Sequence, residues 1–335
     1  MKTSDFDYSL PPERIAQEPA NPRDSSRLLV LNRATGESAH HHFFDLPKFL
    51  TPGDLLIVNE SRVFKARLQA NGIEIFLIRP EGSHWIALAK PAKKLSAGSP
   101  LIFDDGSNAH VIEKREDGTV IVDFQKSVED VLAWTDRFGS VPVPPYIQPT
   151  ETNRAEYQTV YAKTTGSVAA PTAGFHFTLE LIEKLKANEI RFATVTLHVG
   201  LGTFKPITAE TLDGHHMHEE WIEVPKETRD LIAETRRAGH RVIAVGTTTV
   251  RALESGLEQG FTNVFITPGY RFKNVDGLIT NFHLPKSTLI VLVSAFAGEH
   301  HKDPDWGRRT ILATYGEALQ KNYRFASFGD AMLIT

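Results

Sequence analysis

The stretch between residues 62 and 125 constrains the fold most, because it contains six strand-like segments in close succession without a helical period. Four turn dipeptides separate these segments: Asn71-Gly72, Glu81-Gly82, Asp105-Gly106 and Asp117-Gly118. Such dipeptides favour the tight turns of antiparallel hairpins. Six consecutive strands joined in this way predict a small antiparallel β-barrel.

The segments on both sides of this stretch show a different pattern. Residues 26–33 and 53–61 are short apolar runs typical of buried strands, and a helix is expected at 127–138. Residues 141–150 contain four prolines and indicate an extended boundary segment. Beyond it, helices are expected at 178–188, 225–239, 248–260 and 286–298, and strands at 191–199, 219–224, 241–246, 263–267 and 277–282.

This alternation of helices and strands is typical of an α/β fold with a mixed sheet. We therefore expect a discontinuous α/β domain formed by residues 1–65 and 151–335, with the β-barrel inserted as residues 66–150. A length of 335 residues agrees with two domains, since a domain has about 150 residues.

The composition excludes several classes of protein. The chain has no cysteine, which excludes disulfides and thiolate metal sites, and its net charge of −4 argues against a general polyanion binder. The N-terminus lacks the apolar segment of a signal peptide, and the longest apolar run, residues 287–298, is shorter than the ~20 residues that span a bilayer. We expect a cytoplasmic protein without membrane contact.

Residues 170–178, APTAGFHFT, place a histidine between two phenylalanines where a helix is expected to begin. Thr178 is a candidate N-cap for that helix. In one interpretation, a ligand is surrounded by backbone N–H groups and by Pro171, Thr172, Gly174, Phe175 and His176. In the other, the segment is only a capped helix start, and the histidine is satisfied in the core.

Two more turns carry histidine. The strand expected at 191–199 runs into His198, Gly200, Gly202 and Thr203, but Lys205 stands where a dinucleotide fingerprint needs its third glycine. These glycines either cradle a ligand or only turn the chain. The next turn holds His215, His216 and His218, followed by Glu219 and Glu220. It lacks the spacing of a zinc site, so we expect a solvated turn and no metal.

Two strand-to-helix turns complete the candidate set. Thr247 and Thr248 present hydroxyl and N–H groups at a helix N-terminus, which suits an anionic group, and Arg251 is placed to pair with Glu254 three residues on. The segment with Asn281, His283 and Lys286 imitates a P-loop without its glycine frame, which excludes a nucleotide triphosphatase.

These polar turns all fall at strand or helix ends of the α/β part, where open sheets bind ligands, so we expect one composite site. The expected barrel contributes Lys90, Lys93 and Lys94. Such a cluster is either a solvated face or a phosphate-contacting patch.

Several long motifs of this chain resemble one enzyme family. They are YQTVYA, GSVAAPTAGFHFT, LHVGLGTFKP, HHMHEE, AVGTTTVRALES, ITNFHLPKSTLIVLVSAFAG and FASFGDAMLI. Together they are similar to the S-adenosylmethionine:tRNA ribosyltransferase-isomerases of queuosine biosynthesis. The resemblance covers almost the whole chain and is weakest across the expected barrel.

The resemblance implies an α/β domain with an inserted barrel and S-adenosylmethionine as co-substrate, without a redox cofactor. The ribosyl group would move to 7-aminomethyl-7-deazaguanine at the wobble position of tRNA. Epoxyqueuosine-tRNA, adenine and methionine would be the products. The expected partner is this tRNA, with the barrel lysines on its phosphates, and the expected assembly is a monomer or a weak oligomer.

The residue inventory fits such a reaction. A sulfonium acidifies the neighbouring ribose C5′ hydrogens, so a base must take one of them while an acid helps adenine to leave. Histidine performs either task near neutral pH, and His176, His198, His218 and His283 are the candidates. Phe175 or Phe177 would line the cationic sulfur. The competing interpretations are a methyltransferase, which shares the co-substrate, and a non-catalytic RNA-binding module.

Overall fold

The computed structural model describes residues 1–200, 202 and 206–335. Thr203, one of the candidate ligand-binding residues, lies outside this described part. The chain divides into two compact units, each made of more than one segment. Unit one comprises Met1–Ser61, Gln158–Thr164 and Pro171–Thr335, and unit two comprises Arg62–Tyr157 and Thr165–Ala170.

Unit one is built on a nine-stranded mixed sheet. In spatial order its strands are β15 (Gln259–Thr262), β13 (Glu220–Glu223), β12 (Arg191–Leu197), β3 (Leu55–Asn59), β14 (Val242–Val245), β16 (Gly277–Asn281), β17 (Ala331–Ile334), β1 (Arg27–Leu31) and β2 (Ser38–His42). The four strands from β12 to β16 are mutually parallel, whereas β17 runs antiparallel to β16 and parallel to β1. The expected mixed α/β fold is confirmed.

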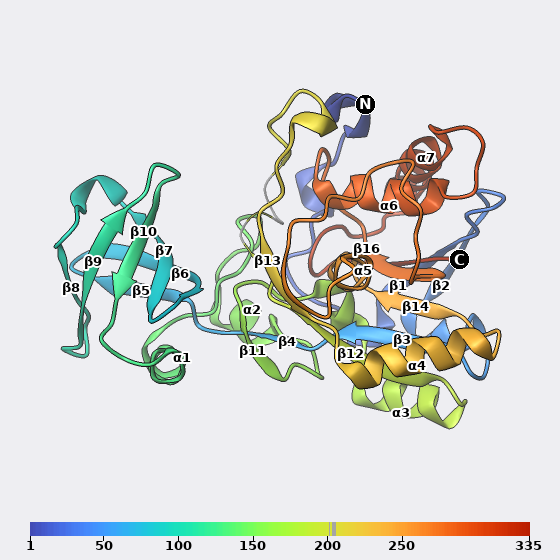
Figure 1. Ribbon diagram of the computed structural model, residues 1–335. Helices are drawn as coiled ribbons and strands as arrows, with labels where there is room; N and C mark the ends of the chain where they lie inside the picture. Colours follow the sequence, from blue (N-terminus) through green and yellow to red (C-terminus); the bar gives the residue numbers. More distant parts are fainter. Residues whose placement is uncertain (201, 203–205) are drawn as a thin grey trace. The chain divides into compact units, whose positions relative to one another are not determined.

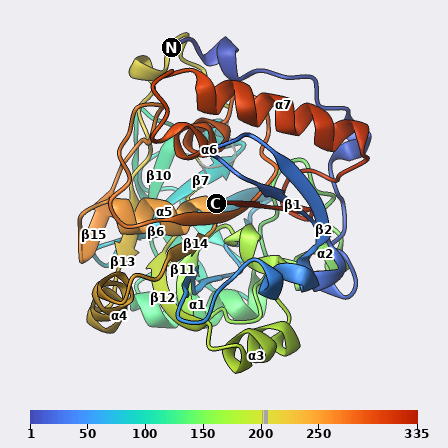
Figure 2. The ribbon, with the colours of Figure 1, turned by 90° about the vertical axis from the view of Figure 1, so that its right-hand side faces the viewer.

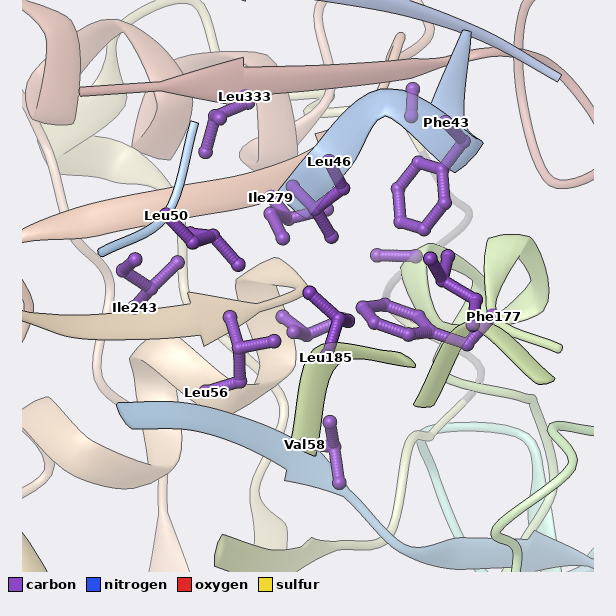
Figure 3. Close-up of a cluster of buried hydrophobic side chains, with 14 of the residues drawn as sticks. Phe43, Leu46, Leu50, Leu56, Val58, Phe177, Leu185, Ile243, Ile279 and Leu333 are labelled. Atoms are coloured by element: carbon purple, nitrogen blue, oxygen red, sulfur yellow. The ribbon is translucent and has the colours of Figure 1, made fainter. Parts of the chain in front are cut away.

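Helices cover both faces of this sheet. The views in Figure 1 and Figure 2 place α4 (Lys226–Arg237), α6 (Thr288–Gly298) and α7 (Trp306–Gln320) on one face, and α3 (Leu179–Ala187) on the other. Every residue of β3, β14 and β16 is buried, as expected for parallel strands covered on both faces. Between α3 and the sheet lies a cluster that includes Phe43, Leu56, Phe177 and Leu185 (Figure 3).

Local signals set several of the helix ends. The Thr178 hydroxyl accepts a hydrogen bond from the Leu181 N–H at 3.1 Å, which confirms the predicted N-cap of α3. One expectation is wrong: α5 (Thr247–Glu254) ends six residues early, and the next strand is β15 rather than residues 263–267. The Leu257 N–H bonds the Ser255 hydroxyl and Gly256 adopts a positive φ, so the chain turns there and pairs with β13.

Unit two contains a six-stranded antiparallel sheet that is nearly closed into a barrel. Its strands in spatial order are β5 (Arg67–Ala70), β6 (Ile73–Glu81), β7 (His84–Lys90), β10 (Thr119–Asp123), β9 (Asn108–Lys114) and β8 (Pro100–Ile102). The Asn71 N–H donates to the Ile102 carbonyl at 3.1 Å and brings the two edge strands together. The expected small antiparallel barrel is confirmed.

The remaining elements of the described chain are short. Helix α1 (Val128–Phe138) packs on the barrel through Trp134, whose ring lies 4.8 Å from that of Phe103. Helix α2 (Glu151–Glu156) follows, and β4 (Ser61–Val63) and β11 (Thr164–Ser167) form a two-stranded sheet. Within the described residues, we find no helix with the length and apolar character that crossing a membrane requires.

The contact between α6 and α7 depends on glycine. A side-chain carbon at Gly307 would approach the Ser294 carbonyl oxygen and the Gly298 nitrogen to less than 3.0 Å, so the two backbones meet without room for a methyl group. Gly316, on the same helix, has open space at the equivalent position.

We therefore expect Gly307→Ala to lower the free energy of unfolding by ~1–3 kcal/mol, because the helices must separate. Gly316→Ala is the matched control and should be neutral or stabilising by up to ~1 kcal/mol, since alanine restricts the unfolded chain and favours helix. Urea unfolding of both variants measures the difference. Equal stabilities would contradict the close backbone contact.

Candidate functional site

The polar groups of unit one gather at one end of the sheet. The parallel strands β12, β3, β14 and β16 end there, and β17 and β1 begin there, since Asn281 lies opposite Ala331 and Ala331 opposite Leu28. In open α/β sheets, ligands bind at the carboxyl ends of the parallel strands. The structure brings the candidate residues of four sequence-distant turns to this end.

The first cluster centres on His176, which ends a 3-10 helix over Thr172–His176. Its Nδ1 lies 2.8 Å from the Ser26 hydroxyl, and its Nε2 lies 3.3 Å from Nδ2 of Asn281. The Thr172 hydroxyl donates to Oδ1 of Asn281 at 3.4 Å. The cluster thus ties the turn to the end of β16 and to the residue that precedes β1.

The hydrogen bonds define the state of this imidazole. Asn281 donates through Nδ2 to the Ala326 carbonyl at 3.2 Å as well as to His176, so Nε2 accepts and Nδ1 carries the proton. Burial, together with the charges of Arg324 and Arg23, lowers the pKa of His176 to about 3. His176 is therefore neutral near pH 7, and both of its nitrogens are bonded within the protein.

The glycine and the aromatic residues of the same turn are tightly packed. A side-chain carbon at Gly174 would collide with the Tyr161 hydroxyl and the Thr159 methyl group. The Phe175 ring stacks on Phe328 at 5.6 Å and carries the Arg23 guanidinium 5.2 Å from its centroid. Phe177 is fully buried against Phe43, so it belongs to the core cluster.

The second cluster surrounds His198, the residue that follows β12. Its ring stacks on Trp221 with 5.1 Å between centroids and 18° between planes, and its Nδ1 lies 3.3 Å from the Ser61 hydroxyl. The Ser61 hydroxyl donates to the Leu197 carbonyl at 2.7 Å. Burial lowers the pKa of His198 to about 4. His198 keeps partial exposure, whereas His176 is 3% exposed.

A buried ion pair lies next to this cluster. Arg251, on α5, pairs with Glu220 at the start of β13, and their side chains are only 4% and 3% exposed. The second oxygen of Glu220 accepts the Gly200 N–H at 2.9 Å, and Nη2 of Arg251 has no hydrogen-bond partner among the described residues. The predicted pair between Arg251 and Glu254 is wrong.

Tertiary contacts explain that difference. Neighbours three apart on an isolated helix meet only if no other group competes for them. Glu254 instead accepts the N–H groups of Lys273 and Asn274, while Arg251 faces the buried carboxylate on β13.

The first turn of α5 lies against the His176 turn. Gly246, with φ of 94°, precedes this helix, and a side-chain carbon there would lie 3.5 Å from the Ala173 methyl group. Thr247 and Thr248 are buried, and the Thr248 hydroxyl is 3.4 Å from Nδ2 of Asn59. The N-terminus of α5 therefore belongs to the same sheet end as both histidine clusters.

The segment after β16, which contains His283 and Lys286, contacts Asp7 and Tyr8 near the N-terminus. His283 contacts the Thr280 hydroxyl through Nε2 at 2.8 Å, and its carbonyl accepts from the Tyr8 hydroxyl. Burial lowers the pKa of His283 to about 3. Lys286, with a positive φ, forms an ion pair with Asp7 at 2.9 Å.

The remaining candidates have different surroundings. His218 is exposed, and Gly202 approaches its ring so closely that a side-chain carbon there would fall within 3.0 Å of it. The lysines Lys90, Lys93 and Lys94 belong to unit two and are exposed. Among the described residues, no group of three or more His, Cys, Asp or Glu side chains is arranged to hold a metal ion.

Sequence reasoning did not single out several residues that complete these clusters. They are Ser26, Asn59, Ser61 and Trp221. Asn59 and Ser61 could have been found from the sequence, because they stand at the end of an apolar strand, where ligands bind. Ser26 and Trp221 have no comparable local signal.

Comparisons with known proteins cover the whole chain. A family model described as "Queuosine biosynthesis protein" matches residues 3–334. Relatives named S-adenosylmethionine:tRNA ribosyltransferase-isomerase are 50% identical in Thermotoga maritima, 49% in Carboxydothermus hydrogenoformans and 46% in Staphylococcus epidermidis, each with full coverage of both chains. The crystal structure of an S-adenosylmethionine tRNA ribosyltransferase from Thermotoga maritima matches 99% of this chain and 100% of its own, with 42% identity and a TM-score of 0.58.

The buried histidines predict a loss of stability in acid. The folded pKa of His176 and of His283 is about 3, and the unfolded value is about 6.5. Between these values the unfolded chain binds protons that the folded chain does not, so stability rises with pH. Each group should therefore cost up to about 1.4 kcal/mol per pH unit as the pH falls below 6.5.

Urea unfolding between pH 7 and pH 4.5 tests this expectation. The free energy of unfolding should fall with decreasing pH, and His176→Gln should show a slope that is shallower by about one proton. The variant loses stability at every pH through its missing hydrogen bonds, so the slope is the relevant measurement. An unchanged slope would show that His176 is not held neutral by the fold.

Proposed function

The chain belongs to the queuosine biosynthesis protein family, and from this premise we propose that it is an S-adenosylmethionine:tRNA ribosyltransferase-isomerase. It transfers and isomerises the ribosyl moiety of S-adenosylmethionine onto 7-aminomethyl-7-deazaguanine at the tRNA wobble position. The products are epoxyqueuosine-tRNA, adenine and methionine. The observation that carries the proposal is the full-length relationship to enzymes of that name.

The site at the carboxyl end of the sheet supports this reaction. The transfer needs a base for a C5′ hydrogen and an acid for adenine, and His176, His198, His218 and His283 are the groups proposed for this chemistry. Their surroundings differ: two are buried and neutral, one is partly exposed and one is exposed. The residues proposed to line the co-substrate site at this end of the sheet are Thr172, Gly200, Thr247, Thr248 and Asn281.

Charged groups would complete the co-substrate site. Nη2 of Arg251 has no hydrogen-bond partner among the described residues, and an additional acceptor would satisfy it. Phe175 is the aromatic residue proposed near the cationic sulfur, since aromatic faces attract cations. The unpaired guanidinium nitrogen suits a ligand with a carboxylate, which S-adenosylmethionine has.

The tRNA would be held by a barrel lysine patch, which we define as Lys90, Lys93, Lys94 and Lys114. The first three are exposed, and Lys114 donates to the Ala92 carbonyl at 2.9 Å, which places its charge beside the turn that holds Lys93 and Lys94. Lysines of this kind contact phosphates and position RNA without reading its sequence. The wobble base would leave its stack to be modified, at a cost of a few kcal/mol.

Labelled co-substrate distinguishes the proposed reaction from its alternatives. With tRNA that carries 7-aminomethyl-7-deazaguanine, ribose label should enter the tRNA, methyl label should leave in methionine, and adenine should appear one-for-one with modified tRNA. Methyl label in the tRNA would instead identify a methyltransferase. Binding of tRNA with no released product would identify an RNA-binding module.

The lysine patch makes a separate prediction. Lys93→Ala should weaken tRNA binding and lower the slope of log K against log salt by about 1, because one phosphate contact is lost. Affinity for S-adenosylmethionine should change little. Lys226→Ala is the matched control, since Lys226 is exposed on α4 in an ion pair with Asp230. A slope equal to that of the control would show that the patch is only a solvated face.

A further inference from the structure

We propose that His198 accepts the proton in this reaction and that Ser61 and Trp221 hold its imidazole in one tautomer and one orientation. The inference rests on the proposed function. It assigns the base among the four candidate histidines and identifies two positioning residues. The hydrogen bonds and ring contacts around His198 are the evidence for this assignment.

The tautomer follows from the Ser61 hydroxyl. A serine has one hydroxyl hydrogen, and that of Ser61 is donated to the Leu197 carbonyl at 2.7 Å. The same oxygen lies 3.3 Å from Nδ1 of His198, so it accepts a hydrogen there. Nδ1 must therefore carry the imidazole proton, which leaves Nε2 with its lone pair.

The orientation follows from Trp221. The two rings stack almost in parallel, and the His198 N–H donates to the Trp221 carbonyl at 2.9 Å. Both the backbone and the side chain of His198 are thus attached to the start of β13. The imidazole cannot rotate to present Nδ1 to a ligand without losing its stacking contact and its bond to Ser61.

Ser61 is itself held in a rigid frame. Its N–H donates to Oδ1 of Asn59 at 3.0 Å, and the same oxygen accepts the Leu197 N–H at 3.1 Å. Nδ2 of Asn59 donates to the Leu197 carbonyl at 3.0 Å. Asn59 and Ser61 are both fully buried. A base must sit within hydrogen-bond reach of the proton it removes, and a rigid frame of this kind preserves such a position.

The other candidates lack this combination. His176 uses both nitrogens in hydrogen bonds within the protein, and His283 is buried with Nε2 on the Thr280 hydroxyl. His218 is exposed, and no hydrogen bond from the described part of the chain fixes its ring nitrogens. His198 alone among the four is partly exposed while its protonated nitrogen is fixed by a buried group. Its lowered pKa agrees with a neutral imidazole at pH 7.

The first test is spectroscopic and needs no turnover. In protein labelled with 15N-histidine, His198 should show a protonated Nδ1 and an unprotonated Nε2 at pH 7, with the signal assigned by its loss in His198→Gln. Ser61→Ala should shift the resonances toward a mixture of tautomers. An Nε2-protonated imidazole in the wild type, or no change in Ser61→Ala, would overturn the assignment of the frame.

The second test measures adenine release from S-adenosylmethionine with modified tRNA. His198→Gln should lower kcat by ~10²-fold or more, and Ser61→Ala by about 10-fold, with the KM for S-adenosylmethionine nearly unchanged. Ser255→Ala is the matched control, because its hydroxyl also donates to a backbone carbonyl but lies at the far end of α5.

The outcomes separate this inference from the proposed function. A wild-type protein that releases no adenine would refute the function, while the spectroscopic result would still test the frame. Normal adenine release by His198→Gln would refute His198 as the base and leave the function intact. A fall in Ser61→Ala that matches its loss of folded protein, at an unchanged tautomer, would reduce Ser61 to a structural role and overturn its assignment as a positioning residue.

Discussion

The site depends on the buried side-chain amide of Asn59. Its hydrogen bonds satisfy backbone groups of β12 at the point where the pairing of β3 with β12 ends. The ladder between β3 and β12 stops at the pair of Asn59 with Val195, because the chain leaves the sheet after β3. The Asn59 side chain then bonds both the N–H and the carbonyl of Leu197. Without it, the Leu197 N–H would lose this bond, at a cost of about 1–3 kcal/mol, whereas the Leu197 carbonyl would keep the bond from the Ser61 hydroxyl. The Asn59 side chain thus makes the hydrogen bonds that a paired strand would otherwise make. His198 is the next residue after Leu197 in the chain.

The histidines at this sheet end differ in how completely the protein uses their nitrogens. His176 joins the residue before β1 to the end of β16 through Ser26 and Asn281, so both nitrogens of its imidazole are used in hydrogen bonds. Within the described residues, a hydrogen bond fixes only one ring nitrogen of His198, and Trp221 stacks on its ring. Burial lowers the pKa of both imidazoles. The two histidines therefore differ more in the number of their internal hydrogen bonds than in their pKa values.

The buried pair of Glu220 and Arg251 gives the same region its electrostatic frame. It joins β13 to α5, and Glu220 also accepts the Gly200 N–H. Removing one partner of such a pair typically costs ~3–5 kcal/mol, because the other charge stays buried. Glu220 and Trp221 are neighbours in β13, so a single short strand positions both the ion pair and the ring beneath His198.

Local chemistry in the sequence determined the strands of the barrel, the N-cap of α3 and the occurrence of polar turns at strand ends. Turn dipeptides and caps act within a few residues, so they can be recognised without a structure. Only the tertiary structure decided that Arg251 meets Glu220 rather than Glu254, that Phe177 lies in the core, and that Ser61 faces His198 from 137 positions away in the chain. These partners are chosen by the order of strands in the sheet, because a buried polar group bonds whichever group the neighbouring strand presents to it.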